Sequence, residues 1–398
     1  MLALRRARMA ASPPFLRGGF RPFFFLGALW AVVALALWLL VLWGVPALPT
    51  AFPPLAWHRH EMLFGFVGAV VAGFLLTAIP NWTGRLPIAG LPLAGLAGLW
   101  AAARLAVLFS AVTGPAVAAL LDIGFYLVLA GFAAREVLAA KNRNLPLVGI
   151  VLLLGVANSI DHAAALGLLS DPDIGARAAI ALVVMMISLV GGRIVPSFTR
   201  NWMTKQGMTE RLPSQPTRFD MLVLGVSGIA LLAWVALPDS PAAGWLLVGA
   251  GLLQTLRLSR WGGLRSARDP LVLILHVGYL WVPVGLLLLG VSILDVSIPR
   301  SAAIHALTAG AMSTMILAVM TRATLGHTGR ALVATKPTIL LYCLVTLGAV
   351  LRVTAGLGLI DYAIGRDAAA VAWATAFVLY LATYGPMLFG ARPGEENA

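Results

Sequence analysis

Cysteine is almost absent from this chain of 398 residues, which has a single one, Cys343, inside an apolar run. One thiol excludes a disulfide framework, a cysteine-held iron–sulfur cluster and a CxxC redox motif. The chain also lacks a Walker loop, a GxGxxG fingerprint and an HExxH motif, so ATP-driven transport and hydrolysis are disfavoured. A bound metal would therefore use histidine, methionine, carboxylate or backbone ligands.

Charged residues are scarce as well. Only 11% of the residues are charged and 60% are hydrophobic, and the mean hydropathy is +0.93. A soluble domain has about 25% charged and about 45–50% apolar residues, so the composition predicts an integral membrane protein. The net charge of +13 then marks cytoplasmic loops, and no nucleic-acid partner is expected.

Apolar runs of about 20 residues, long enough to cross the hydrocarbon layer, recur along the chain, and proline or glycine separates most of them. We predict one polytopic domain over residues 1–398. The basic segment 5–8 and the apolar run after it are interpreted as an uncleaved first helix, since the run is too long for a signal peptide. The twelve predicted transmembrane helices are 21–44, 57–80, 91–111, 115–138, 146–169, 175–196, 219–238, 241–260, 270–291, 301–322, 337–360 and 368–390.

The distribution of basic residues tests this assignment. With the N-terminus placed in the cytoplasm, 22 Lys and Arg residues fall on the inner side and four on the outer side. This positive-inside bias supports an even number of helices and predicts that both termini are cytoplasmic.

Two stretches resemble one another at an offset of 245 residues. Each begins at a histidine, His60 or His305, and ends at a Thr-Gly-Arg triplet, at 83–85 or 328–330. Weaker matches relate both to the helix predicted at 175–196. This pattern predicts three four-helix pseudo-repeats, because internal repeats are common in polytopic membrane proteins. Chance similarity between apolar segments is the alternative.

His60 and His305 lie at the outer ends of two helices that run inward, so they lie at one depth. Ionisable groups in a bilayer usually face the protein interior, and imidazoles from facing helices suit a haem with two axial histidines. We predict such a haem between the second and tenth helices, near the periplasmic side. Gly65 and Gly310 would let a helix or a macrocycle approach closely. The alternative for each histidine is a hydrogen-bonded packing role.

Arg104 and Arg352 form a second symmetric pair, each in the outer half of the helix that follows a histidine helix. A buried arginine needs an anionic partner. Haem propionates would supply one, and snorkelling to the outer interface is the alternative.

The other histidines are candidates of lower rank. His58, His276 and His327 could hold copper or a second haem. His162, which follows Asp161, is expected to be a packing residue near the outer end of its helix.

Five segments combine histidine, glycine, proline or aromatic residues: 57–65, 79–84, 196–201, 276–279 and 325–330. Together they resemble the NnrS family, over nearly the whole chain. The resemblance implies a polytopic protein of the bacterial inner membrane that contains haem and copper and acts in denitrification or nitric oxide tolerance. The histidine motifs of the family match here at His58, His60, His276, His305 and His327.

A weaker, architectural resemblance is to subunit I of the haem–copper oxidases. That fold has twelve helices in three pseudo-repeats and holds a haem through histidines on its second and tenth helices, a pattern that His60 and His305 match. This chain lacks the histidines that hold the oxidase copper on the sixth and seventh helices. Terminal oxidase chemistry is therefore disfavoured, since fold alone does not carry function.

These features predict a haem- and copper-binding redox protein of nitric oxide metabolism or nitrosative stress tolerance. Its expected partners are the lipid bilayer, nitric oxide and an unidentified electron donor. Whether it is an oxidoreductase acting on nitric oxide or an electron-transfer protein stays open. The alternatives are a membrane transporter or a metal or haem carrier, and a non-catalytic nitric oxide sensor.

Overall fold

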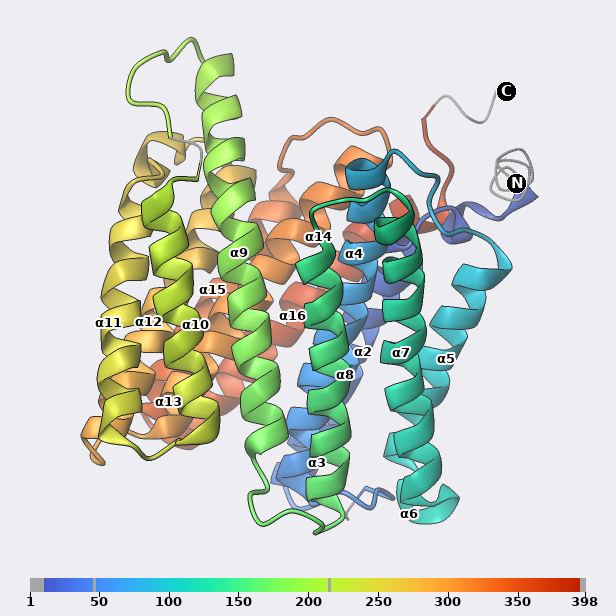
Figure 1. The fold of residues 1–398 in the computed structure, drawn as a ribbon, viewed down its shortest axis with the longest axis vertical. Coiled ribbons are helices and arrows are strands. Elements are labelled where there is room, and N and C mark those ends of the chain that lie inside the picture. Colours follow the sequence, from blue (N-terminus) through green and yellow to red (C-terminus); the bar gives the residue numbers. More distant parts are fainter. Residues whose placement is uncertain (1–10, 46–47, 214–215, 394–398) are drawn as a thin grey trace. The chain divides into compact units, whose positions relative to one another are not determined.

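The computed structural model describes residues 11–45, 48–213 and 216–393, which form helices and no strand (Figure 1). The prediction of an all-α membrane protein is confirmed for these ranges. The basic segment 5–8 and the C-terminal residues 394–398 lie outside them. The interpretation of segment 5–8 and the apolar run after it as an uncleaved first helix therefore stays a prediction. So does the cytoplasmic location of both termini.

The chain divides into two compact units. Unit 1 comprises Met1–Ala179, Ala323–Arg330 and Leu381–Ala398, and unit 2 comprises Ile180–Arg322 and Ala331–Tyr380. A single polytopic domain over residues 1–398 stays a prediction.

The first half of the chain supplies most of unit 1. One long helical segment in it changes from α-helix to π-helix and back, and is labelled in three parts, α3, η2 and α4. The elements are η1 (Pro14–Leu16), α2 (Phe20–Leu42), α3 (Pro54–His60), η2 (Glu61–Val67), α4 (Gly68–Thr83), α5 (Leu91–Leu108), α6 (Ser110–Thr113), α7 (Pro115–Ala139) and α8 (Leu145–Ala165).

The second half supplies most of unit 2 and repeats the alternation of α-helix and π-helix in α13, η4 and α14. Three helices of this half, α9, α14 and α16, have residues in both units. The elements are α9 (Ile174–Lys205), α10 (Arg218–Ala236), α11 (Pro241–Ser259), η3 (Gly263–Ser266), α12 (Pro270–Leu294), α13 (Arg300–His305), η4 (Ala306–Met312), α14 (Ser313–His327), α15 (Lys336–Gly356) and α16 (Tyr362–Phe389).

Eleven helical segments in the described ranges are long and apolar enough to cross a membrane, and they coincide with eleven of the twelve predicted spans. The remaining prediction, at 241–260, corresponds to α11, which is not among the eleven. Two polar residues within it, Gln254 and Arg257, lower its hydropathy. Both are buried inside the protein, so α11 still presents apolar residues outward. Twelve spans stay a prediction.

Proline marks the beginnings of these helices and not only the loops between them. It occupies the first turn of α5, α7, α8, α11, α12 and α15. There the missing N–H costs no hydrogen bond, since the first turn of a helix has no intrahelical acceptors for it. At the other end of a helix, Gly84 ends α4 with φ of 67°, which a glycine adopts without steric cost.

The two π-helical segments coincide with the sequence repeat. Each begins directly after a repeat histidine: η2 follows His60 and η4 follows His305. An offset of 245 residues superimposes their two ends, 61 on 306 and 67 on 312. In each unit the preceding and following helices pack on the π segment: α2 and α5 on η2, and α12 and α15 on η4. Because π segments are rare and gather at functional sites, this match supports the pairing of the two stretches. The threefold repeat stays a prediction.

Unit 2 is held together by a buried polar network that begins at Arg257. Its Nε donates to Asp220 at 2.8 Å, and its Nη1 donates to the Ser188 carbonyl and the Tyr279 hydroxyl at 2.9 Å each. Tyr279 in turn donates to Gln254 at 2.7 Å. The network joins α9, α10, α11 and α12. Of these, α10, α11 and α12 stand side by side in Figure 1.

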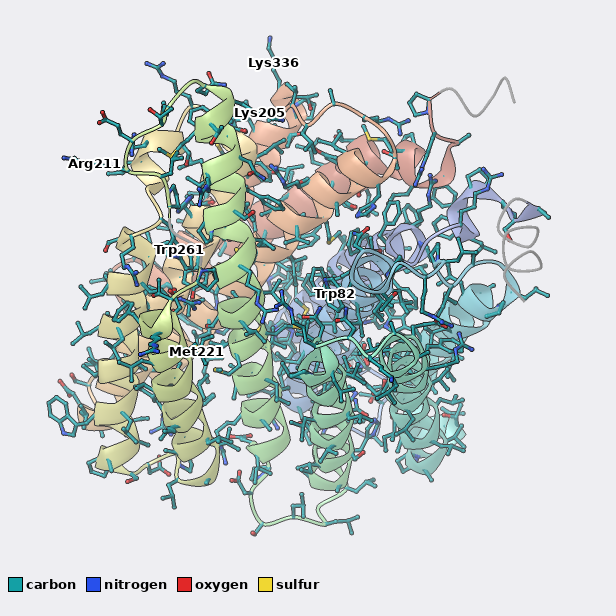
Figure 2. All side chains as sticks on the ribbon, turned by 45° about the horizontal axis from the view of Figure 1, so that its top comes forward. Trp82, Lys205, Arg211, Met221, Trp261 and Lys336 are labelled. Atoms are coloured by element: carbon teal, nitrogen blue, oxygen red, sulfur yellow. The ribbon has the colours of Figure 1, made fainter. Side chains whose placement is uncertain are left out.

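Two neighbours make room for this arginine and shield it. Gly192 of α9 faces the guanidinium so closely that any side chain there would displace it. Trp261, labelled in Figure 2, lies 5.4 Å from the Arg257 guanidinium and packs edge-on against Tyr279. Arg257 is therefore fixed from several sides.

We expect Arg257→Met to destabilise the protein by about 3–5 kcal/mol, because it leaves Asp220 buried without its guanidinium. The double variant Arg257→Met with Asp220→Asn should recover part of this loss, since it removes the unpaired charge and keeps an acceptor for the Thr217 N–H at the start of α10. Thermal unfolding of the detergent-solubilised protein measures both. Equal loss in the single and double variants would contradict the pairing.

Candidate metal centre

Unit 1 contains a cluster of seven ionisable or polar side chains that are almost completely buried. They come from four parts of the fold: the end of α3 with the start of η2, and α5, α7 and α8. Their exposed fractions lie between 0% and 4%. The residues are His60, Glu61, Arg104, Asp122, Asn158, Asp161 and His162.

His60 lies between two carboxylates. Its Nδ1 is 2.8 Å from Asp161 Oδ2 and its Nε2 is 2.9 Å from Asp122 Oδ2. An ionised carboxylate only accepts hydrogen bonds, so both contacts are hydrogen bonds when both ring nitrogens carry hydrogen. The same positions suit a ring whose Nδ1–H is held by Asp161 while Nε2 binds a cation that Asp122 shares, an arrangement found around many metal-bound histidines.

Asp122 is the centre of the cluster. Its Oδ2 lies 3.2 Å from His162 Nε2 and accepts from Asn158 Nδ2 at 2.7 Å, in addition to its contact with His60. Its Oδ1 accepts from Arg104. These contacts from several directions fix the orientation of the carboxylate.

Arg104 connects this carboxylate to a second one. Its Nη1 donates to both oxygens of Glu61, at 3.0 and 2.9 Å. Trp30 of α2 also donates to Glu61, at 2.6 Å. Gly65 permits this packing: a Cβ at that position would lie 2.6 Å from Glu61 Oε2 and 2.9 Å from Trp30 Nε1.

The carboxylates of the cluster outnumber its one guanidinium. With Glu61, Asp122 and Asp161 ionised and both imidazoles neutral, the buried net charge would be −2. Uncompensated buried charge costs several kcal/mol per ion. Two protons or one divalent cation would remove it.

Two buried acceptors in the cluster have no hydrogen-bond partner. They are Asp161 Oδ1 and Asn158 Oδ1. Such atoms are uncommon in native proteins and often mark a position for a water or an ion. Both are oxygens, which attract a cation.

His60, Asp122 and His162 are the residues that could hold this cation. Each offers one ligand atom, and these atoms lie within 4.8 Å of one another. Two imidazoles and a carboxylate suit Fe(II), Cu(II) and Zn(II), and the set offers no thiolate or thioether of the kind that selects Cu(I). It is the one such group of three found within residues 11–45, 48–213 and 216–393.

The predicted site residues are thus in different situations. Arg104, assigned to a haem propionate, is bound by Glu61 and Asp122. His58 stacks on Trp38 at 4.7 Å between ring centroids, whereas His60 faces α7 and α8. His327 lies 5.5 Å from the Phe20 ring.

In unit 2, His305 and its partners form no comparable cluster. Its Nδ1 donates to the Ser301 carbonyl at 2.7 Å, which leaves Nε2 as the lone-pair nitrogen. Arg352 donates to the Ser301 hydroxyl at 3.3 Å and lies 5.5 Å from the Tyr362 ring. Gly310 packs on Trp281, whose ring carbon would lie 2.6 Å from a Cβ there.

His276 is also in unit 2, where it is bound to a hydroxyl. Its Nε2 is 2.8 Å from Thr199 Oγ1, which itself donates to the Val195 carbonyl at 2.8 Å. His276 is therefore the donor in that contact. No structural observation assigns a metal to His58, His276 or His327, and their roles as ligands stay predictions.

Five residues of the cluster were absent from the sequence-based site. Two signals in the sequence could have indicated them. One is Asp122, a carboxylate within the predicted span 115–138, since such residues are rare and usually functional. The other is the adjacent pair Asp161 and His162 in α8. His162 was expected to be a packing residue, whereas the structure places it beside Asp122 and His60. The missed residues are Glu61, Asp122, Asn158, Asp161 and His162.

An exposed loop at 166–173 joins α8 to α9 beside this cluster. Arg59, the neighbour of His60, donates to Asp173 and to the Pro172 carbonyl of the loop. Within the loop and the start of α9, Arg177 pairs with Asp171. These contacts fasten the loop to α3.

The family model described as "NnrS protein" matches residues 14–392. No curated protein matches the chain. The match covers every residue of the cluster.

The pH dependence of the 166–173 loop should follow Asp171. The Arg177 side chain holds the pKa of Asp171 below its usual value. The stabilisation is therefore present above the unfolded value of about 3.9 and is lost as the pH falls through the lower folded value. Because the pair is partly exposed, the effect should not exceed about 1 kcal/mol. Limited proteolysis of the loop from pH 6 to pH 3 measures it, and Asp171→Asn should reduce the pH dependence, while the Arg59–Asp173 pair remains.

Proposed function

Because this chain belongs to the NnrS family, we propose that it is a membrane protein of the nitric oxide response that binds a redox metal ion at His60, Asp122 and His162. Family membership supports the nitric oxide context. The single observation that carries the metal proposal is the buried cluster, in which one ligand atom each of His60, Asp122 and His162 lie within 4.8 Å of one another.

Copper, which the family resemblance implies, fits this ligand set in its divalent form. Both Cu(II) and Fe(II) accept imidazole and carboxylate ligands. Zinc would fit the ligands but has no redox chemistry. Copper or iron would supply a one-electron redox change and a position for a small ligand.

The surrounding residues have definite tasks in this proposal. Asp161 accepts the Nδ1–H of His60 and so presents Nε2 to the ion. Arg104 offsets part of the negative charge and holds Asp122 and Glu61 in place. Because these side chains are buried, the site excludes bulk water.

Haem ligation by His60 and His305 stays a proposal, and the two histidines fit it to different degrees. His305 has its Nδ1–H bound to a carbonyl, so its Nε2 suits iron. The Nε2 of His60 faces Asp122, and this contact would have to break for His60 to bind haem iron. A haem held through His305 and a copper or iron ion held through His60 avoid that conflict.

Arg352 fits a propionate better than Arg104 does. Within the described ranges no carboxylate forms an ion pair with Arg352, and its Nη1 is buried without a hydrogen-bond partner. Arg104 already binds two carboxylates. A bacterial inner-membrane location with cytoplasmic termini also belongs to this proposal, on the basis of the positive-inside bias.

Two other functions compete with a redox role. A transporter or a metal or haem carrier would release its cargo, and a buried site closed on all sides does not favour rapid exchange. A sensor without turnover would use the same metal site. The identity of the electron donor decides between sensor and oxidoreductase.

Metal analysis of the purified protein tests the central proposal. We expect about one copper or iron ion per chain, and its loss in Asp122→Asn and in His162→Ala. Asp161→Asn should keep the ligands but weaken metal affinity about 10- to 100-fold, as loss of a histidine-orienting carboxylate does. Asp220→Asn, at a buried aspartate paired with an arginine in unit 2, is the matched control and should keep the metal. Full metal content in Asp122→Asn would refute the site.

The haem proposal has its own spectroscopic test. The reduced protein should show a haem absorption band that is lost or shifted in His305→Ala. His162→Ala should retain the band, since His162 is not proposed as a haem ligand. A protein that contains no haem, or a band unchanged in His305→Ala, would exclude haem ligation at His305.

A further inference from the structure

The two histidines of the candidate metal centre share one aromatic neighbour. The ring of Phe52 lies 4.8 Å from the His60 ring and 5.3 Å from the His162 ring, between centroids. Phe52 is 5% exposed. It therefore covers both imidazoles with an apolar surface.

Phe52 is held in this position by its loop. The backbone N–H of Ala51 donates to the Ser110 hydroxyl at 2.8 Å, and the Thr50 hydroxyl donates to the Val107 carbonyl at 2.9 Å. These bonds fix the segment before Phe52 to the end of α5 and to α6. The ring is set in place by the fold and does not depend on a ligand.

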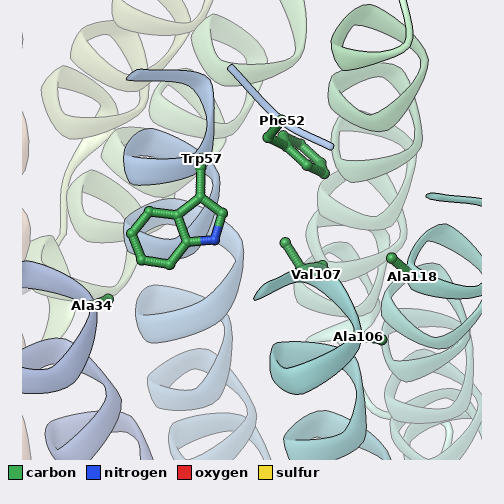
Figure 3. Packing of buried hydrophobic residues seen from close by; sticks show 6 residues of the cluster. All are labelled: Ala34, Phe52, Trp57, Ala106, Val107 and Ala118. Atoms are coloured by element: carbon green, nitrogen blue, oxygen red, sulfur yellow. The ribbon is translucent and has the colours of Figure 1, made fainter. Parts of the chain in front are cut away.

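Phe52 also belongs to an apolar cluster that contains Trp57 (Figure 3). Trp57 is three residues before His60 on α3, so the two side chains are neighbours on one helix face. The other buried members of the cluster are Ala34, Ala106, Val107 and Ala118.

The indole of Trp57 carries an unused donor. Trp57 is 0% exposed, and its Nε1 has no hydrogen-bond partner. A buried donor left unpaired costs about 1–3 kcal/mol, and such a group in a native protein calls for an explanation. In Figure 3 the indole nitrogen is on the side of the ring that faces Phe52 and Val107.

These features restrict the kind of molecule that could lie here. The residues around the Trp57 N–H are aromatic and aliphatic, so a charged group placed against them, away from the ion, would lose its hydration without compensation. The only guanidinium of the cluster, Arg104, is bound to Glu61 and Asp122. A purely apolar molecule would leave the Trp57 N–H unpaired. A small uncharged molecule with one acceptor atom satisfies both conditions.

We propose that Phe52 and Trp57 form the binding site of a small uncharged diatomic ligand beside His60 and His162, and that the Trp57 Nε1–H donates a hydrogen bond to it. Nitric oxide has this size, charge and acceptor, and it dissolves in the bilayer. The inference rests on the proposed function, because the ligand would bind the ion held by these histidines. Phe52 limits access, and Trp57 slows release.

The test uses the purified full-length protein with its metal, and nitric oxide as the probe. The N–O stretching frequency is read by infrared difference spectroscopy with ¹⁴NO and ¹⁵NO, and the dissociation rate is read by stopped flow. Trp57→Phe removes the donor and keeps an aromatic ring. It should raise the N–O frequency and speed dissociation about two- to tenfold, the effect of one lost hydrogen bond.

The chain offers a matched control. Trp234 in α10 is also 0% exposed with an unpartnered Nε1, but it belongs to unit 2. Trp234→Phe should leave the frequency and the rate unchanged. Phe52→Ala should speed association and leave the frequency unchanged, because the donor remains.

The outcomes separate this inference from the metal proposal. Wild-type frequency and rate in a metal-loaded Trp57→Phe protein would overturn the inference alone, as would an equal effect of Trp234→Phe. Absence of an N–O band in a wild-type protein that holds its metal would also overturn it. Metal that persists in Asp122→Asn would overturn both proposals.

Discussion

The contacts of Arg104 with Glu61 and Asp122 determine how unit 1 is built. They join η2, α5 and α7, and the bonds from Asp122 and Asp161 to His60 add α8. In an apolar surrounding each of these charges would be costly alone. The helices therefore pack in the arrangement that pairs them. Unit 2 follows the same rule around Arg257, whose bonds join α9, α10, α11 and α12.

The segments α3–η2–α4 and α13–η4–α14 have the same local structure but different surroundings. Both have a histidine followed by a π segment, and a glycine five residues after the histidine packs on a tryptophan of the preceding helix. They differ in the residue after the histidine, which is Glu61 in one and Ala306 in the other. Unit 1 consequently gathers carboxylates around its histidine and suits a cation. In unit 2, His305 and Arg352 are without carboxylate partners among the described residues, which suits a different ligand.

Aromatic residues complete the site in unit 1. Phe52 lies against His60 and His162, and Phe64 lies 5.1 Å from the His60 ring. They exclude water from the polar cluster and strengthen its electrostatic interactions, since the effective dielectric constant falls. The same apolar cover selects against charged ligands. In unit 1 the polar cluster would thus bind the ion, and the aromatic residues beside it would select the ligand of that ion.

The sequence by itself determined the membrane class and the positions of eleven helices long and apolar enough to cross a membrane. These are local properties: a run of apolar residues, its length and a repeat can be recognised without knowing what touches what. Only the tertiary structure decided that Asp122, Asp161 and His162 meet His60, because they lie 62 to 102 residues further along the chain and helix packing brings them together. It also decided the partners of Arg104. Hydropathy places a charge within a span, but only packing shows which opposite charge lies within reach.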